Sequence, residues 1–281
     1  MTISAKIIED SISDANIRLT TIQLMYPRFI HAEFMTHRVF SRNASSSRAI
    51  PVAKMLEMVR KEPAMPIHWG ANRPGMQAKE QLTGDALTEA KNAWLSAAQL
   101  AVESSEKMQK LGLHKQVANR VTEPFQHISV VVTATEWTNF FGLRCHPDAQ
   151  PEIEALANQM LLAMQFSKPK KLRKGEWHLP YVTEEERAGI FKDDLPKISG
   201  ARCARVSYLT HDGENPSLEK DLQLYKALVG SEPLHASPIE HAATPDDFVH
   251  LGNKIVWEKP EYHGNLKGWI QFRKLVESSL V

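Results

Sequence analysis

A short polar stretch of the chain, FMTHRVFSRNASSSRAIP at 34–51, concentrates groups that bind anions. It contains three arginines, a histidine, an asparagine and four serines. Serine hydroxyls, backbone amides and a guanidinium can together hold a phosphate group. The helix predicted to start at Pro51 would add its own N–H groups. A solvated polar turn with helix caps is the alternative, and the residue types alone leave both interpretations open.

Hydrophobic periodicity predicts the elements that must position this stretch. Residues 17–35 mix β-branched and aromatic residues around a proline, and predict two short strands or one bulged strand. Residues 127–135 predict a buried strand. Apolar spacing predicts helices over 85–113 with a stop at Gly112, over 136–144, over 151–165 after an opening Pro147, over 217–230 and over 268–279. The predicted fold class is α/β (α+β), as one domain over 1–281, with the charged segment 168–200 as a candidate linker.

Composition narrows the class of protein. Hydrophobic content of 42% and charged content of 24% are ordinary for a globular protein, and a net charge of +1 gives no overall field for nucleic acid. Cys145 and Cys203 form no metal-ligand spacing and no disulfide framework, so we expect no metal. The first residues carry acids where a signal peptide needs an apolar run, and no stretch approaches a membrane span. We expect a cytoplasmic protein without a membrane partner.

The stretch THRVFSRNASSSR resembles the signature of the flavin-dependent thymidylate synthases (ThyX). That signature runs Arg-His-Arg, two residues, Ser, one residue, Asn, two residues, Ser, one residue, Arg. Six positions match it in order: His37, Arg38, Ser41, Asn43, Ser46 and Arg48. Thr36, Ala44 and Ser47 stand where the family has Arg, Glu and Gly.

A second segment, 119–157, resembles the family's Arg-x-x-x-Pro strand and its Asn-Phe-x-x-Leu-Arg helix. The matching positions are Arg120, Asn139, Arg144, Gln150 and Glu152. Thr133 and Thr135 replace an Asn and an Arg that hold the flavin in the family.

Two further blocks resemble the family but stand in a different order. ARVSY (204–208) and HASPIEH (235–241) look like blocks that precede the Arg-His-Arg signature in the family, whereas here they follow it. A circularly permuted ThyX-like fold, a mixed sheet with long helices, accounts for this order, since chain termini often lie close together on a domain surface. The divergent, permuted pattern looks phage-like, which would place the protein in the cytoplasm of an infected host.

The resemblance implies one-carbon transfer to C5 of dUMP. In the family the carbon comes from methylenetetrahydrofolate, reduced FAD completes the methyl group and NADPH reduces the flavin, in a homotetramer with sites at subunit interfaces. The departures at Thr36, Ala44, Thr133 and Thr135 leave two alternatives open. One is a dUMP or dCMP hydroxymethylase that omits the reductive step, and the other is an inactive nucleotide- or flavin-binding protein.

The resemblance also implies roles for single residues. Arg144 would be catalytic and contact the substrate, because a guanidinium stays charged and can stabilise negative charge on the uracil ring. The remaining substrate-binding positions are Ser46, Ser47, Arg48, Arg120 and Glu33. The cofactor-binding positions are His37, Arg38, Asn43, Asn139, Ser207, Ser237 and His241.

Structural alternatives exist for several of these residues. Arg144 could instead be a surface arginine paired with Asp148 at i, i+4. His241 could cap a helix or fill a polar core position. Cys145, next to Arg144, suggests a nucleophile, but adjacent helical positions point ~100° apart, so an ordinary buried thiol is the better interpretation. A basic patch over 28–48 for nucleic acid lacks an aromatic stacking surface beside its arginines.

The assignment of Arg144 predicts a kinetic contrast with Arg48. Arg144→Ala should lower turnover by ~10²–10³ and raise the substrate constant less, because the interaction forms mainly in the transition state. Arg48→Ala should weaken nucleotide binding with turnover nearly kept, since a phosphate contact is similar in both states. Steady-state kinetics on both variants measures this contrast, and turnover within a few fold of wild type in Arg144→Ala contradicts the catalytic assignment.

Overall fold

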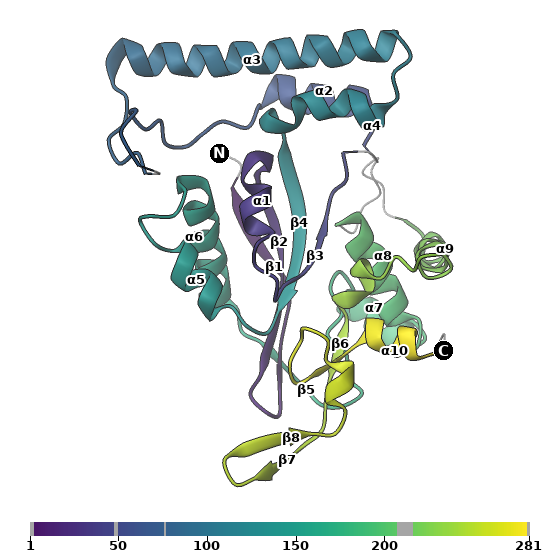
Figure 1. The fold of residues 1–281 in the computed structure, drawn as a ribbon. Helices are drawn as coiled ribbons and strands as arrows, with labels where there is room; N and C mark the ends of the chain where they lie inside the picture. Colours follow the sequence, from purple (N-terminus) through teal and green to yellow (C-terminus); the bar gives the residue numbers. More distant parts are fainter. Residues whose placement is uncertain (1–2, 48–49, 76, 207–215, 280–281) are drawn as a thin grey trace.

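A five-stranded sheet lies at the centre of the computed structural model, which describes residues 3–47, 50–75, 77–206 and 216–279. Arg48 and Ser207 lie outside the described residues. The strand order is β3-β4-β2-β1-β5 (Figure 1), with β1 parallel to β5 and the other neighbours antiparallel. The strands are β1 (Ser4–Ser13), β2 (Arg18–Pro27), β3 (Ser41–Ala44), β4 (His127–Ala134) and β5 (Lys170–Leu172).

Both faces of this sheet are covered. α5 (Thr138–Arg144) and α6 (Pro151–Phe166) lie over one face, and α8 (Leu195–Arg205) lies on the other side (Figure 1). β4 has the sequence HISVVVTA, with three consecutive valines, which is typical of a strand whose side chains are buried on both faces. Val130 and Val132 pack in the core with α6, whereas Val131 packs with Cys203 of α8.

A long helix, α3 (Gly84–Lys110), crosses one end of the sheet above α2 (Val52–Lys61) (Figure 1). Val52, Leu56 and Val59 of α2 pack on Ala98 and Val102 of α3. The helix ends where the sequence predicts, because Gly112 adopts a φ of +85° that other residues rarely take.

The remaining helices and strands complete the chain. The short helices are η1 (Arg28–Ile30), α1 (His31–Phe34), α4 (Lys115–Ala118), η2 (Asn119–Phe125), α7 (Glu184–Gly189), α9 (Leu218–Val229), η3 (Ser237–Glu240), η4 (Pro260–Tyr262) and α10 (Phe272–Ser279). β6 (Ala243–Pro245) pairs with β9 (Trp269–Gln271), and β7 (Phe248–Leu251) with β8 (Lys254–Trp257). Among the described residues, no helix is both long and apolar enough to cross a membrane.

Three predicted elements differ from the structure. The strand prediction over 17–35 is right for β2 but wrong after Pro27, where η1 and α1 bury Ile30 and Phe34 four residues apart on one helical face. The helix predicted after Pro147 begins at Pro151, because 146–149 form a turn closed by Ala149 N donating to His146 O. The helix predicted over 268–279 begins only at Phe272, because 269–271 pair with β6.

The candidate linker 168–200 is built into the sheet. It contributes β5, which pairs with β1, and the first half of α8. Its His178 is fully buried and its backbone pairs with Ala243. The charged residues of this segment therefore belong to the surface of an ordered part of the fold.

A line of buried hydrogen bonds crosses the face of the sheet that α8 covers. His178 Nδ1 lies 2.9 Å from Ser11 Oγ, and His178 Nε2 lies 2.8 Å from Thr21 Oγ1. Thr21 Oγ1 lies 2.6 Å from Thr133 Oγ1, and Thr133 Oγ1 lies 2.8 Å from His241 Nδ1. Thr21 and Thr133 are register partners of β2 and β4, so their side chains point to the same face. The line connects three strands to two segments that lie far away in sequence.

The line of hydrogen bonds predicts a pH-dependent role for His178. Burial lowers the pKa of His178 well below its usual value, so the folded protein keeps this ring neutral. His178→Gln should destabilise the fold at pH 7.5 by ~1–3 kcal/mol, because buried partners lose their bonds. Below pH ~6.5 the unfolded wild-type chain alone takes up a proton at this position, so this cost should shrink by up to ~1.4 kcal/mol per pH unit. Urea unfolding of both proteins at pH 7.5, 6.5 and 5.5 measures the difference, and a constant difference contradicts the role.

Candidate functional site

The side chain of Arg144 lies at the C-terminal end of α5 against α1. Its Nε donates to His37 Nε2 at 3.0 Å, and its terminal nitrogens lie 3.4 Å from Glu33 Oε2 and 3.4 Å from Thr36 Oγ1. The Arg144 side chain is 20% exposed, so it is only partly shielded from solvent. The alternative pairing with Asp148 is wrong, because the Arg144 side chain turns toward α1. We call Arg144, Glu33, Thr36 and His37 the guanidinium cluster.

His37 is held as a neutral ring within the guanidinium cluster. It accepts from Arg144 at Nε2, so its proton belongs on Nδ1. Burial lowers the pKa of His37, and the charges of Arg144 and Arg42 lower it further. Arg42 also donates to the backbone oxygens of Met35 at 2.8 Å and His37 at 3.0 Å, which fixes the turn before β3.

A second cluster lies beyond the other end of β3, where the serine-rich stretch meets η2. Glu123 Oε1 accepts from Arg120 at 2.9 Å and from Ser47 Oγ at 3.3 Å, and it lies 2.9 Å from a terminal nitrogen of Arg28. Asn119, which is buried, donates to Ser47 O at 2.8 Å. The structure thus brings the predicted substrate residues Ser47 and Arg120 together. We call Ser47, Arg120, Glu123 and Arg28 the anion cluster.

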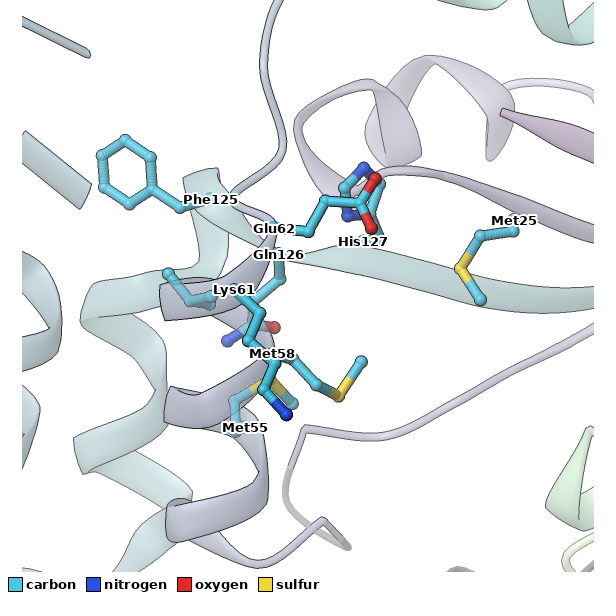
Figure 2. Close-up of a pocket in the computed structure, with 9 residues that line it drawn as sticks. Met25, Met55, Met58, Lys61, Glu62, Phe125, Gln126 and His127 are labelled. Carbon is cyan, nitrogen blue, oxygen red and sulfur yellow. The ribbon is translucent and has the colours of Figure 1, made fainter. Parts of the chain in front are cut away.

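A cavity of about 160 Å³ adjoins the anion cluster. Its polar lining consists of Arg28, Ser45, Ser47, Lys54, Gln126, His127 and Ser129. A second pocket of about 250 Å³ lies next to it under α2, and the two share lining residues that include Met25, Met55, Met58 and His127 (Figure 2). The surface beside the anion cluster therefore changes from polar to apolar over a short distance.

The other predicted substrate residue of the serine-rich stretch, Ser46, also belongs to this loop. Its backbone oxygen accepts from Ile50 N at 3.4 Å, and Ser45 N donates to Ser129 O of β4 at 2.8 Å. The loop therefore continues the pairing of β3 with β4 before it turns toward α2.

The predicted cofactor positions fall into three environments. Asn43 of β3 donates to Cys203 O at 2.8 Å and Ala204 O at 3.2 Å, and it accepts from Ser237 Oγ at 3.3 Å. The block 235–241 thus lies beside the signature strand β3. Arg38 and Asn139 are exposed. His37 is the exception, because it lies in the guanidinium cluster, outside these three environments.

His241 occupies the third environment. It is fully buried, its Nδ1 contacts Thr133, and burial lowers its pKa to about 3. Its Nε2 has no partner among the described residues, and the same holds for the buried Oγ1 of Thr135. His241 is the C-cap residue of η3, and its buried ring, bonded to Thr133 of the sheet, fills a polar core position.

Cys145 does not act on the guanidinium side of α5. It is half-buried against the core that contains α6, and burial raises the pKa of its thiol. A thiol that stays protonated is a poor nucleophile.

Two motif residues flank β3: His37 of the guanidinium cluster precedes it in the sequence and Ser47 of the anion cluster follows it. A four-residue strand spans ~13 Å, so these two residues lie beyond opposite ends of the strand, and Asn43 with its contact Ser237 lies between them.

Comparison with known proteins places the chain in a family. A model described as thymidylate synthase complementing protein (Thy1) matches residues 18–170, more than half of the 281 residues. The chain belongs to this family. The Thy1 match contains both clusters and leaves out the blocks 204–208 and 235–241, so the permuted order stays a prediction.

Two solved structures of a UMP/dUMP methylase PolB from Streptomyces cacaoi are similar to this Thy1-family chain. The structure bound with 5-Br dUMP is 19% identical at a TM-score of 0.48, and covers 58% of this chain and 89% of that chain. The structure bound with 5-Br UMP is 18% identical at a TM-score of 0.49, and covers 58% and 88%. No curated protein sequence matches the chain.

Three residues in or beside the anion cluster match none of the motifs: Arg28, Asn119 and Glu123. Only Glu123 has a local signal in the sequence, which is its i, i+3 spacing from Arg120 on a helical turn. Arg28 lies 95 positions from Glu123 in the sequence, and only the packing of η1 on η2 brings the two side chains together.

The contact between Arg144 and His37 predicts a measurable change in titration. Arg144→Gln should raise the pKa of His37, because it removes a positive neighbour and the donor that favours the neutral ring. NMR titration of the His37 ring measures the shift. Arg120→Gln is the matched control and should leave His37 unchanged. An unchanged pKa in Arg144→Gln would show that this contact does not hold the ring neutral.

Proposed function

We propose that this protein transfers a one-carbon unit to C5 of dUMP as a thymidylate synthase-like enzyme. The observation that carries the proposal is that residues of the family's motifs gather in two groups, the guanidinium cluster and the anion cluster. One group is a guanidinium beside a neutral histidine, and the other is a serine and an arginine directed at one anion. A nucleotide needs both kinds of contact, one for its ring and one for its phosphate.

Arg144 is proposed to stabilise the negative charge that develops on the uracil ring as C5 attacks the one-carbon electrophile. Its donors are already aligned by His37 and Glu33, so little reorganisation is needed when the charge appears. Glu33 can only accept when ionised, which suits the N3–H of uracil. The phosphate would bind Ser46, Ser47, Arg48 and Arg120, whose contacts are similar in the ground and transition states.

The carbon donor is proposed to be methylenetetrahydrofolate, and the flavin FAD, with NADPH as the source of electrons. When bound, reduced FAD would supply the hydride that completes the methyl group. The residues present fit a flavin in part. His241 Nε2 and Thr135 Oγ1 are buried without partners, which suits a polar ligand. Arg38, Asn43, Asn139, Ser207 and Ser237 would complete the flavin site.

The position of the two clusters supports a site shared between subunits. His37 of the guanidinium cluster and Ser47 of the anion cluster flank β3, and this spacing supports a nucleotide that takes part of its contacts from another copy. We therefore propose a homotetramer with sites at subunit interfaces. The contact of Ser237 with Asn43 likewise supports a circularly permuted arrangement.

One alternative reaction is favoured by specific residues. Thr36 and Thr135 replace arginines of the family pattern, and Thr133 is hydrogen-bonded to His241 and Thr21 in the sheet. Loss of two cations weakens the hold on an anionic flavin. A dUMP or dCMP hydroxymethylase that omits the reductive step fits these losses. An inactive binding protein fits less well, because Arg144 keeps an ordered set of partners.

Mass spectrometry of the product tests the proposal. The purified protein is incubated with dUMP or dCMP and methylenetetrahydrofolate, with and without FAD and NADPH. A methylated product from dUMP that requires FAD and NADPH is the expected result. A hydroxymethylated product formed without NADPH would establish the alternative reaction, and no product under any condition would overturn both.

A further inference from the structure

One oxygen of Glu123 is surrounded in the way that a phosphate oxygen is. Two guanidinium groups lie 2.9 Å from Oε1 and a serine hydroxyl lies 3.3 Å from it. Arg28 and Glu123 have no part in the family signature. The anion cluster therefore holds a bound anion already, and this anion belongs to the chain itself.

We propose that the carboxylate of Glu123 occupies the phosphate position of the substrate in the nucleotide-free protein, and that the phosphate displaces it. In the displaced state Arg28 becomes an additional phosphate ligand, beside Ser47 and Arg120. The identity of the phosphate as that of a deoxyuridine nucleotide rests on the proposed function. The exchange of a carboxylate for a phosphate does not.

Charge favours the exchange. Arg28 and Arg120 bring two positive charges, and Glu123 neutralises only one of them. A phosphate monoester carries ~1.5–2 negative charges at pH 7 and three acceptor oxygens, so it balances the two guanidinium groups more completely. Charge-assisted and bidentate bonds from arginine to phosphate are also among the stronger hydrogen bonds in proteins.

The backbones that carry Arg28 and Ser47 are held by contacts that do not depend on the Glu123 side chain. Arg28 N donates to Gln126 O at 2.8 Å, which ties η1 to the end of η2, and Asn119 holds the backbone of Ser47. Neither contact involves Glu123. The Glu123 side chain is 25% exposed and can turn into solvent, and Arg120 is 53% exposed, so a ligand can reach both.

Glu123 could either compete with phosphate or orient the two arginines, and the two roles predict opposite changes in phosphate affinity. If the carboxylate only orients the two arginines, its removal disorders them and weakens phosphate binding. If it competes with phosphate, its removal strengthens phosphate binding. The sign of the change in affinity therefore decides between competition and orientation.

Calorimetric titration of wild type and Glu123→Gln with dUMP, deoxyuridine and inorganic phosphate measures this sign. Glutamine keeps the shape and removes the charge, so we expect dUMP and phosphate to bind about tenfold more tightly, with deoxyuridine unchanged. Arg28→Gln should weaken dUMP binding and leave deoxyuridine unchanged. Glu106→Gln is the matched control, because Glu106 also pairs with an arginine, Arg60, but away from the anion cluster.

Thermal unfolding of each variant checks that the fold is kept. Should Glu123→Gln fail to fold, Glu123→Asp retracts the carboxylate by one methylene and should give a smaller tightening. Equal or weaker dUMP and phosphate binding in the folded variant overturns the proposal, and so does the absence of phosphate-dependent binding in both proteins. Tighter phosphate binding without any turnover of dUMP or dCMP supports the inference and removes the proposed function. Turnover of dUMP or dCMP without tighter phosphate binding in Glu123→Gln overturns the inference and supports the proposed function.

Discussion

The pairing of β3 with β4 is the interaction on which the rest of the site depends. Four residues of the polar signature, Ser41–Ala44, are fixed against the most buried strand of the sheet. This pairing leaves the histidine and its neighbours at one end and the serine-rich loop at the other. Side-chain contacts of β3 hold this register, because Ser41 Oγ donates to Asn265 Oδ1 at 3.2 Å and Asn43 donates to Cys203 O at 2.8 Å. The register of β3 therefore fixes where the two clusters lie.

Both clusters hold their arginines with internal acceptors. Arg144 is bonded to His37 and Glu33, and Arg120 and Arg28 meet at Glu123. Such contacts order long, flexible side chains before a ligand arrives, which reduces the conformational entropy lost on binding. An anionic ligand that binds these arginines competes with the carboxylates of Glu33 and Glu123. Its affinity then depends on how much stronger its bonds to the arginines are than those of the carboxylates.

The sheet is joined to the C-terminal half of the chain by hydrogen bonds between buried polar groups. His178 reaches the strands from the segment 168–200, and His241 reaches them from η3. Buried polar groups are costly when unpaired, so this line favours one arrangement of the covering segments over others. The tryptophan-containing loop 175–181 has a structural part in this arrangement, because it carries His178 and packs Trp177 against Phe272.

The sequence by itself determined the elements whose signals are local. β4, α3 and α9 follow from apolar runs and helical spacing, and the candidates Arg144 and Arg120 follow from the resemblance of their segment to the ThyX motifs. Tertiary structure alone decided which side chains meet. Arg28 and Glu123 carry no motif, and His178 meets Ser11 across 167 positions of sequence. β9 pairs with β6 along its whole length instead of forming the first turn of α10, because pairing satisfies the backbone groups that face the neighbouring strand. Such outcomes depend on the packing of segments that are distant in the chain, and no local pattern of residues encodes them.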